Sequence, residues 1–451
     1  MSTNAAAVAP ATTRPDLDRR TGPATAIIFL LLLASGLAYM TTSLTNDVGS
    51  SIGHATAWLP YALLGVALFI ALGFEFVNGF HDTANAVATV IYTHSLPSHV
   101  AVLWSGLFNF LGVMVSSGAV AFGIISLLPV ELILQVGSSA GFAMVFALLI
   151  AAILWNLGTW WLGLPASSSH TLIGSIIGVG VANALMHGRN GTSGVDWAQA
   201  TKVGWSLLLS PIIGFLLSAV LLLVLKAVFK NKDLYREPRA KAPPPWWIRT
   251  LLVLTCTGVS FAHGSSDGQK GMGLIMLILV GTIPTAYALN RAMPDTEMTR
   301  FAALATVTQQ SLAATAAPAA ADSHTILTDY VRTKQFAPQV IGALATTVGD
   351  IGNQVKSYGS LRLMPADAVT NTRNDMYLAS EAIRFLQKDK KAQFSGDAKN
   401  NLKAFKSEID NATKFIPTWV KVVVAIALGL GTMVGWKRIV ITSARRSARP
   451  I

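Results

Sequence analysis

One apolar stretch of the chain, residues 74–93, carries acidic, amide and imidazole side chains at a depth where a bilayer would surround them. Its polar side chains are Glu75, Asn78, His81, Asp82 and Asn85. Ionisable groups inside a membrane are costly, and where they occur they usually line the path of an ion or a substrate. This stretch therefore predicts a functional site within a membrane domain.

A weaker copy of the stretch occupies residues 261–273. Both copies contain the pattern Phe-x-x-Gly-x-x-Asp, so that Asp267 in the second corresponds to Asp82 in the first. Polar, glycine-containing breaks at matching places in two hydrophobic halves are typical of secondary transporters with internal repeats. We therefore expect an all-α polytopic membrane protein.

Composition agrees with a membrane protein. Of the 451 residues, 52% are hydrophobic and 12% are charged, and the mean hydropathy is +0.51. These values exclude a soluble enzyme with one buried core. The net charge of +12 does not indicate nucleic acid, because the Lys and Arg residues lie in loops and tails that flank apolar spans. We expect no nucleic-acid partner, and the single cysteine, Cys256, excludes an intramolecular disulfide.

Hydropathy and charge divide the chain into seven expected segments. They are a disordered tail (1–23), a first transmembrane half (24–229), a basic cytoplasmic loop (230–248), the start of a second transmembrane half (249–285), a soluble helical insertion (286–415), a transmembrane helix (416–436) and a basic tail (437–451). Basic residues before the first apolar run place the N-terminus in the cytoplasm. A cleaved signal peptide is the less favoured alternative for that run.

Asp82 and Asp267 are the strongest candidates for coupling transport to a cation. A carboxylate at this depth can ligate a cation or carry a proton, and the cation offsets the charge of a co-transported anion. The alternative, a helix-packing role, is less favoured because the Asp recurs in two matching contexts. Glu75 lies two helical turns before Asp82 and shares its face, and Asn85 offers a neutral oxygen.

A serine cluster after Pro165 opens another apolar helix. Hydroxyls and free backbone N–H groups at a helix start form an oxyanion site, although a plain N-cap with extra serines is the alternative. The residues are Ser167, Ser168, Ser169, His170 and Thr171.

Further polar residues are candidates for the same site. Asn78, Gln269 and Lys270 can contact an oxyanion, and His81, His170 and His263 are candidates for a proton relay. For each of these the alternative is a hydrogen-bonded residue between helices. We expect no catalytic, metal or cofactor site, because Ser167, Ser168 and Ser169 do not lie in a Gly-x-Ser-x-Gly nucleophile elbow, and HExxH and P-loop patterns are absent from the sequence. A membrane-embedded hydrolase using Ser168 and His170 is a weaker alternative.

Three of these motifs, in this order, resemble the inorganic phosphate transporter (PiT) family, most closely its bacterial members. They begin at Asn78, Gly163 and His263 and end at Thr89, Gly174 and Gly273, and the resemblance extends from about Trp58 to Trp436. It implies symport of phosphate with protons or sodium through two inverted repeats with glycine-broken helices. A neutral metal–phosphate complex is an alternative form of the substrate. The resemblance implies oxyanion binding by Ser167, Ser168 and Ser169, and cation coupling by Asp82, Asn85 and Asp267.

The sequence departs from the family pattern at two places. Ser266 stands where the family usually has Asn, and a second Ser/Thr-His motif near the C-terminus is missing. The tetrapeptides that begin at Gly112 and Gly431 are similar, and they lie 319 positions apart. The residues that match the serine cluster would lie the same distance after it, which is beyond Ile451. We therefore expect a second repeat that is incomplete. An inactive truncated remnant, or a membrane-anchored interaction protein, is the resulting alternative to a phosphate transporter.

The expected partners follow from this interpretation. They are inorganic phosphate, a coupling proton or sodium ion, and the lipid bilayer, and a homodimer is left open. The expected location is the bacterial inner membrane, which the chain crosses several times.

Overall fold

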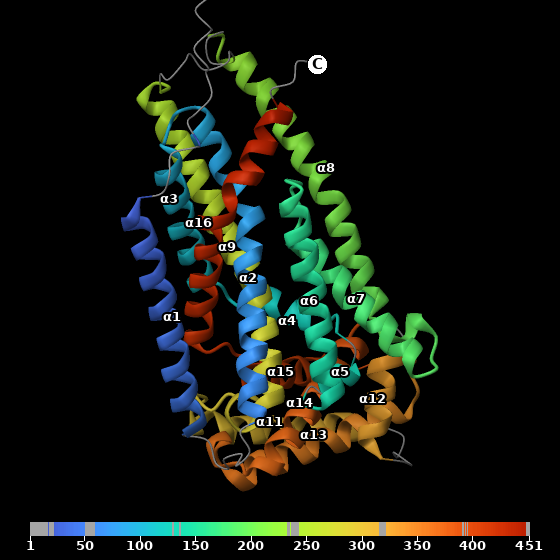
Figure 1. Ribbon diagram of the computed structural model, residues 1–451. Coiled ribbons are helices and arrows are strands. Elements are labelled where there is room, and N and C mark those ends of the chain that lie inside the picture. The colour runs from blue at the N-terminus through green and yellow to red at the C-terminus, as the bar shows by residue number, and fades with distance from the viewer. Residues whose placement is uncertain are drawn as a thin grey trace, which may run out of the picture.

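The computed structural model describes residues 17, 22–49, 59–128, 130–134, 137–231, 235, 243–314, 322–389, 392, 394 and 396–447 (Figure 1). Within this part the chain forms helices and connecting turns, without a strand. Most of the expected tail 1–23 and of the loop 230–248 lies outside the described residues. The expected basic tail is helical up to Ser447, because the last helix continues through it.

Long helices form a bundle along one direction. Seven of them, among the described residues, are long and apolar enough to cross a membrane: α1 (Pro23–Gly49), α2 (Leu59–Tyr92), α3 (Ser98–Val115), α6 (Ser139–Trp161), α7 (Ser168–Met186), α8 (Trp197–Val228) and α16 (Thr418–Ser447). The helix α9 (Trp246–Thr282) carries the second polar motif and lies among them. The fold class, an all-α polytopic membrane protein, is confirmed.

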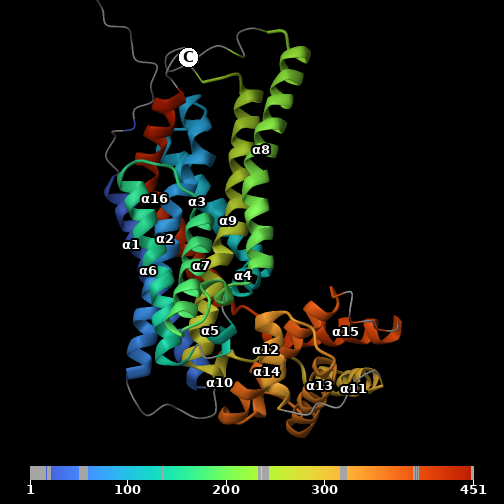
Figure 2. The ribbon, with the colours of Figure 1, turned by 90° about the vertical axis from the view of Figure 1, so that its right-hand side faces the viewer.

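Short helices and a second cluster lie at the lower end of the bundle in Figure 1. The short helices are α4 (Ala119–Ile125), α5 (Val130–Leu134) and α10 (Pro284–Tyr287). The second cluster, which we call the insertion, has its own apolar core and sits beneath the bundle and to one side (Figure 2). Its helices are α11 (Asp295–Ala313), α12 (Ser323–Thr333), α13 (Gln339–Tyr358), α14 (Ala366–Leu386) and α15 (Gly396–Thr413).

Four helices form the centre of the bundle, where α2 packs on α16 and α3 packs on α9. In Figure 1, α2 runs from the lower to the upper end of the bundle and α9 runs the other way. Helix α3 runs from the upper to the lower end, and α16 runs in the opposite direction. Helix α8 stands at the outside, with none of its apolar window buried, as expected of a lipid-facing helix.

Matching glycines lie at the two central crossings. A Cβ on Gly79 in α2 would lie 2.7 Å from the Thr432 nitrogen in α16, and the Leu428 carbonyl oxygen is nearer still. A Cβ on Gly264 in α9 would lie 2.7 Å from the Cα of Asn109 in α3. Gly79 and Gly264 are the corresponding glycines of the two polar motifs. Their contact residues, Leu428 and Asn109, are as far apart in the sequence as the similar tetrapeptides at Gly431 and Gly112. The two crossings therefore correspond in sequence, and the helices that form them run in opposite directions, as an inverted repeat predicts.

The expected break of the helices at these glycines is wrong. Both α2 and α9 are continuous helices through their polar motifs. The physical reason is that a glycine lacks a Cβ, which lets two helix backbones approach closely without interrupting either helix.

Candidate functional site

The two polar motifs face each other across α2 and α9. Glu75 and Asn78 of α2 are fully buried, and Asn78 Nδ2 donates to Glu75 Oε2 at 3.3 Å. Glu75 lies directly against α9, because a Cβ on Gly271 would be 2.6 Å from the Glu75 carboxyl carbon. An acidic side chain is thus enclosed between the two repeats.

A charged pair from α9 completes this cluster. Lys270 is 2% exposed, and its ammonium donates to Asp267 Oδ2 at 2.5 Å. His263 lies one turn before, with its Nε2 3.4 Å from the same oxygen. Gly271, the residue after Lys270, is the one that lies against the Glu75 carboxyl, so the pair and Glu75 are close neighbours. The sequence motifs therefore meet in one buried cluster of two carboxylates and one ammonium.

Two oxygen atoms of this cluster have no hydrogen-bond partner among the described residues. They are Glu75 Oε1 and Asn78 Oδ1. A buried polar atom without a partner costs about 1–3 kcal/mol. A bound proton, cation or substrate donor would satisfy these oxygens.

Other predicted residues lie elsewhere or are already bonded. Gln269 accepts from the Val120 N–H at 2.9 Å and donates to the Ser265 carbonyl at 2.6 Å, so that its amide ties α4 to α9. Asn85 is exposed on α2. Asp82 belongs to α2, and its side chain lies outside the described part of the structure.

The serine cluster lies at the tip of a hairpin formed by α6 and α7, which ends below the upper ends of α8 and α16 in Figure 1. The hairpin tip is anchored to α2 through His81. The Ala166 N–H donates to His81 Nδ1 at 3.4 Å, and His81 Nε2 is 2.8 Å from the Asn156 carbonyl. A carbonyl only accepts, so these partners assign the neutral Nε2–H tautomer.

Within the serine cluster, one hydroxyl points inward. Ser168 is 1% exposed, it lies on the buried stripe of α7, and its Oγ has no partner among the described residues. Ser167 caps α7 by accepting from the His170 N–H at 3.4 Å, and its carbonyl accepts from the Thr171 hydroxyl at 3.1 Å. Ser169 is partly buried and His170 is exposed. Ser168 is therefore the residue of this cluster whose hydroxyl is both buried and without a partner among the described residues.

Sequence reasoning missed Asn156 on α6. It is fully buried, and neither its amide nitrogen nor its amide oxygen has a partner among the described residues. Its backbone carbonyl contacts His81, which places it beside the hairpin tip. The signal was present, since Asn156 is an amide inside an otherwise apolar span.

The described residues offer no group of three or more His, Cys, Asp or Glu arranged to hold a metal ion. What the site offers is a buried carboxylate cluster on one side of α2, and hydroxyl and amide donors at the start of a helix on the other. Hydroxyls, amides and a helix N-terminus are suited to an oxyanion.

Comparison with known proteins decides the family. The sequence profile described as "Phosphate transporter family" matches residues 78–449. The chain belongs to this family. It is 39% identical over 404 residues to the low-affinity inorganic phosphate transporter PitA of Escherichia coli K12, covering 84% of this chain and 79% of that protein. PitB of the same organism is 38% identical over 403 residues, with the same coverage of both chains.

A relative from Buchnera aphidicola, also named a low-affinity inorganic phosphate transporter, is 36% identical over 411 residues. It covers 84% of this chain and 79% of its own length. Among solved structures, "The sodium-dependent phosphate transporter" aligns over 84% of this chain and 88% of its own, with 18% identity and a TM-score of 0.32. This phosphate transporter family member is not an enzyme, and it is a multi-pass protein of the bacterial inner membrane.

Proposed function

We propose that the chain is a secondary active transporter that carries inorganic phosphate together with protons. Membership of the phosphate transporter family supports the substrate. The observation that carries the proposal is the buried cluster of Glu75, Asp267 and Lys270 between the two inverted repeats. In alternating access, two repeats move against each other around such a midplane site.

The proton is favoured over sodium by the ammonium group of Lys270. A sodium ion at Glu75 would add a second positive charge beside Lys270 in a low-dielectric environment, where like charges repel strongly. A proton on Glu75 removes a negative charge instead, and it supplies a donor at the unpartnered Oε1. Sodium coupling is the second candidate.

Phosphate is assigned to the hairpin tip. Ser168 Oγ and the Asn156 amide are buried hydrogen-bonding groups without partners among the described residues, and both lie beside His81 or the start of α7. Their donors, with the helix N-terminus, suit the oxygens of a tetrahedral anion. His81 is assigned a positioning role, since both of its ring nitrogens are engaged with the hairpin backbone.

Charge assigns the orientation. The upper end of the bundle carries basic residues beside the spans, including Lys226, Arg249, Lys437 and Arg438, whereas the lower end carries the insertion. Basic residues close to spans favour the cytoplasmic side, while large domains cross the membrane regardless of their charge. We therefore place the upper end in the cytoplasm and the insertion on the outer side.

The test is uptake of labelled phosphate into proteoliposomes that contain the full chain, with an imposed pH gradient, an imposed sodium gradient, or neither. We expect uptake driven by the pH gradient. Glu75→Gln should abolish this accumulation while phosphate exchange without a gradient persists, and Glu297→Gln, at an exposed glutamate of α11, serves as the matched control. Uptake that responds only to sodium would refute proton coupling.

The substrate site is tested in the same assay. Ser168→Ala should raise the KM for phosphate at least tenfold, because one hydrogen bond to a charged group is worth about 1.5–3 kcal/mol. Ser175→Ala, on the same helix with its hydroxyl already bonded to the Thr171 carbonyl, is the control. Comparing uptake with and without Mg²⁺ separates free phosphate from a metal–phosphate complex.

A further inference from the structure

A cavity of about 370 Å³ lies between the insertion and the lower end of the bundle. Its walls come from three places: helix α4, the lower end of α9, and helix α14 with the segment that follows α15. The bundle side is largely apolar, as at Phe122, Met276 and Leu277. The insertion side carries guanidinium, ammonium and hydroxyl groups, so that the cavity has one polar wall.

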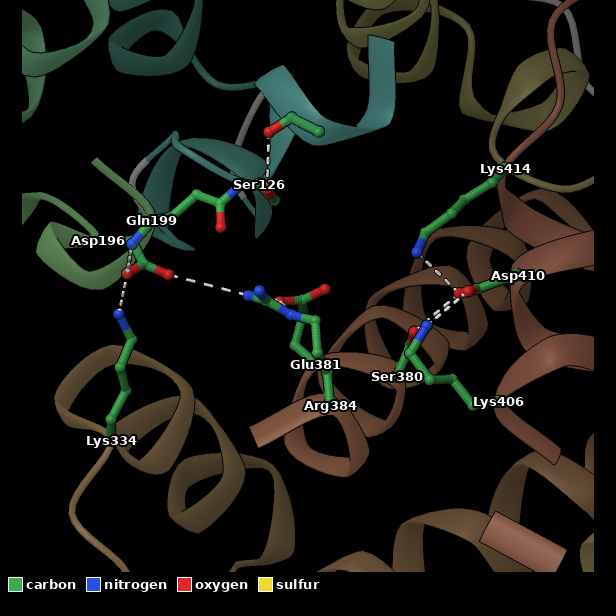
Figure 3. A network of polar contacts seen from close by, with 11 residues as sticks. Ser126, Asp196, Gln199, Lys334, Ser380, Glu381, Arg384, Lys406, Asp410 and Lys414 are labelled. Atoms are coloured by element: carbon green, nitrogen blue, oxygen red, sulfur yellow. Dashed lines mark hydrogen bonds and ion pairs between the residues drawn. The ribbon is translucent and has the colours of Figure 1, made fainter. Parts of the chain in front are cut away.

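Positive charge dominates the polar wall. Arg373, Arg384 and Lys414 line the cavity, whereas Glu381 is its one carboxylate among the described residues. Figure 3 shows how the Lys and Arg residues near Glu381 share their acidic partners. Arg384 Nε donates to Glu381 at 2.7 Å, and its guanidinium also reaches Asp196 at 3.8 Å.

Two further carboxylates, which do not line the cavity, each bond to more than one of the cations in and around this wall. Asp196 also pairs with Lys334. Asp410 accepts from Lys414 at 2.8 Å, from Lys406 at 2.5 Å and from the Ser380 hydroxyl at 2.8 Å. Three carboxylates are thus shared by four cations, which are Arg384, Lys334, Lys406 and Lys414. The lining itself carries three cations and one carboxylate among the described residues, so a net positive charge faces the cavity.

Arg373 is the cation of this wall that lacks an acidic partner in the described part of the chain. Its Nη1 donates to the Ile133 carbonyl at 2.8 Å and to Asn374 Oδ1 at 3.1 Å, both neutral acceptors. Its guanidinium lies 5.7 Å from the centre of the Tyr377 ring. Burial lowers the pKa of Arg373 to about 10. Removing a charge from water without a counter-ion costs several kcal/mol, and an anion in the cavity would offset this cost.

The cavity lies on the outward continuation of the central polar cluster. Leu277 follows Lys270 by seven residues on α9, which corresponds to a rise of about 10 Å. Gln269 holds the first turn of α4 through the Val120 N–H, and the neighbouring Ala119 lines the cavity. The cavity and the buried cluster thus share two helices.

We propose that this cavity binds a phosphate group, held by the guanidinium groups of Arg373 and Arg384 and the ammonium of Lys414. A guanidinium group can bind two phosphate oxygens at once, and two such groups lie on this wall. The phosphate group comes either from free phosphate on the outer side or from the headgroup of an anionic lipid beside the apolar wall. The binding site stands on its own contacts, whereas its place on the outer side rests on the proposed function.

Binding of labelled phosphate to the purified full chain in detergent tests the first source. We expect two classes of site, one weakened at least tenfold by Ser168→Ala and the other by Arg373→Gln and by Lys414→Gln. Arg300→Gln, at an exposed guanidinium of α11, is the matched control and should change neither class. Arg373→Lys keeps the charge and should restore part of the affinity, which a folding defect alone would not allow.

Lipid bound to the same purified proteins tests the second source. Mass spectrometry of phosphatidylglycerol retained after neutral-lipid washing should show loss in Arg373→Gln and Lys414→Gln if the headgroup fills the cavity. Loss of free phosphate or of lipid in these variants supports the site and identifies its source. Unchanged phosphate binding and unchanged lipid in both variants overturns the inference. The two claims can fail separately. If the chain shows no phosphate uptake in proteoliposomes but Ser168→Ala still binds phosphate at the cavity, the proposed function fails and this inference stands.

Discussion

The glycine crossing between α2 and α16 permits a sharp test of how the repeats pack. In Gly79→Ala, the new Cβ would lie 2.7 Å from the Thr432 nitrogen, about 0.7 Å inside the ordinary contact distance of 3.4 Å, and nearer still to a carbonyl oxygen. Both atoms belong to the backbone, so no side-chain rotation relieves the overlap. The two helices must separate, and overpacking of this kind costs about 3 kcal/mol at the upper end of its usual range.

Gly73→Ala is the matched control on the same helix. Nothing lies within 4 Å of a Cβ at this position. Both substitutions gain the same intrinsic helix preference of about 1 kcal/mol, so this term cancels in their comparison. We therefore expect Gly79→Ala to be less stable than Gly73→Ala by about 3 kcal/mol.

The assay is reversible unfolding of the full chain in mixed detergent micelles, followed by circular dichroism as the denaturing detergent is increased. The inverted repeat supplies a second, independent pair, because Gly264 crosses α3 while a Cβ on Gly258 would meet nothing within 4 Å. Equal stability of the two variants in either pair would refute the steric argument. A difference in one pair alone would refute the equivalence of the two crossings.

Three further predictions concern other parts of the chain. Burial raises the pKa of Asp375 to about 6, so the proton it binds stabilises the fold fully below pH 4 and this contribution is lost as the pH rises through about 6. Asp375→Asn should therefore slow hydrogen exchange in α14 at pH 8, where the free energy of opening rises by about 1 kcal/mol after allowing for the partial exposure of the side chain. At pH 4 the exchange should be unchanged. Asp47 accepts from the Tyr287 hydroxyl at 2.7 Å and the Trp419 indole at 3.1 Å, so Asp47→Ala should destabilise the chain by about 2–4 kcal/mol and Asp47→Asn by less, measured by detergent unfolding. His81→Phe removes both bonds to the hairpin and should raise hydrogen exchange at residues 162–167, whereas His187→Phe, at an exposed residue, should not.

Hydropathy and the repeated motif predicted the fold class because both depend on local pattern. An apolar run long enough to span a bilayer forms a helix wherever it lies, since its backbone groups must bond within the segment. The role of Gly79 did not follow from pattern in the same way. A glycine in a polar motif is compatible with a helix break and with a close crossing, and the outcome depends on α16, which is distant in the sequence.

The candidate site was predicted in part. The polar character of an apolar stretch singled out Glu75, Asn78 and Asn85, and the structure buries Glu75 and Asn78. Asn85, chosen on the same ground, is exposed. Spacing fixes the direction of a side chain around its own helix, but burial also requires a neighbouring helix at that height along the axis. That neighbour is a property of the tertiary fold.

Hydrogen-bond partners distinguish the residues proposed to act in transport from other buried polar residues more clearly than burial does. Gln269, Glu75 and Ser168 are all nearly or fully buried, yet the Gln269 amide is bonded at both ends while Glu75 and Ser168 each leave an atom unpaired among the described residues. Each unpaired atom costs about 1–3 kcal/mol, a large fraction of the net stability of a folded chain. In the proposed proton-coupled cycle, these atoms stay unpaired within the fold so that the proton and the phosphate can bind to them. On that proposal, the cost in stability follows from the transport cycle.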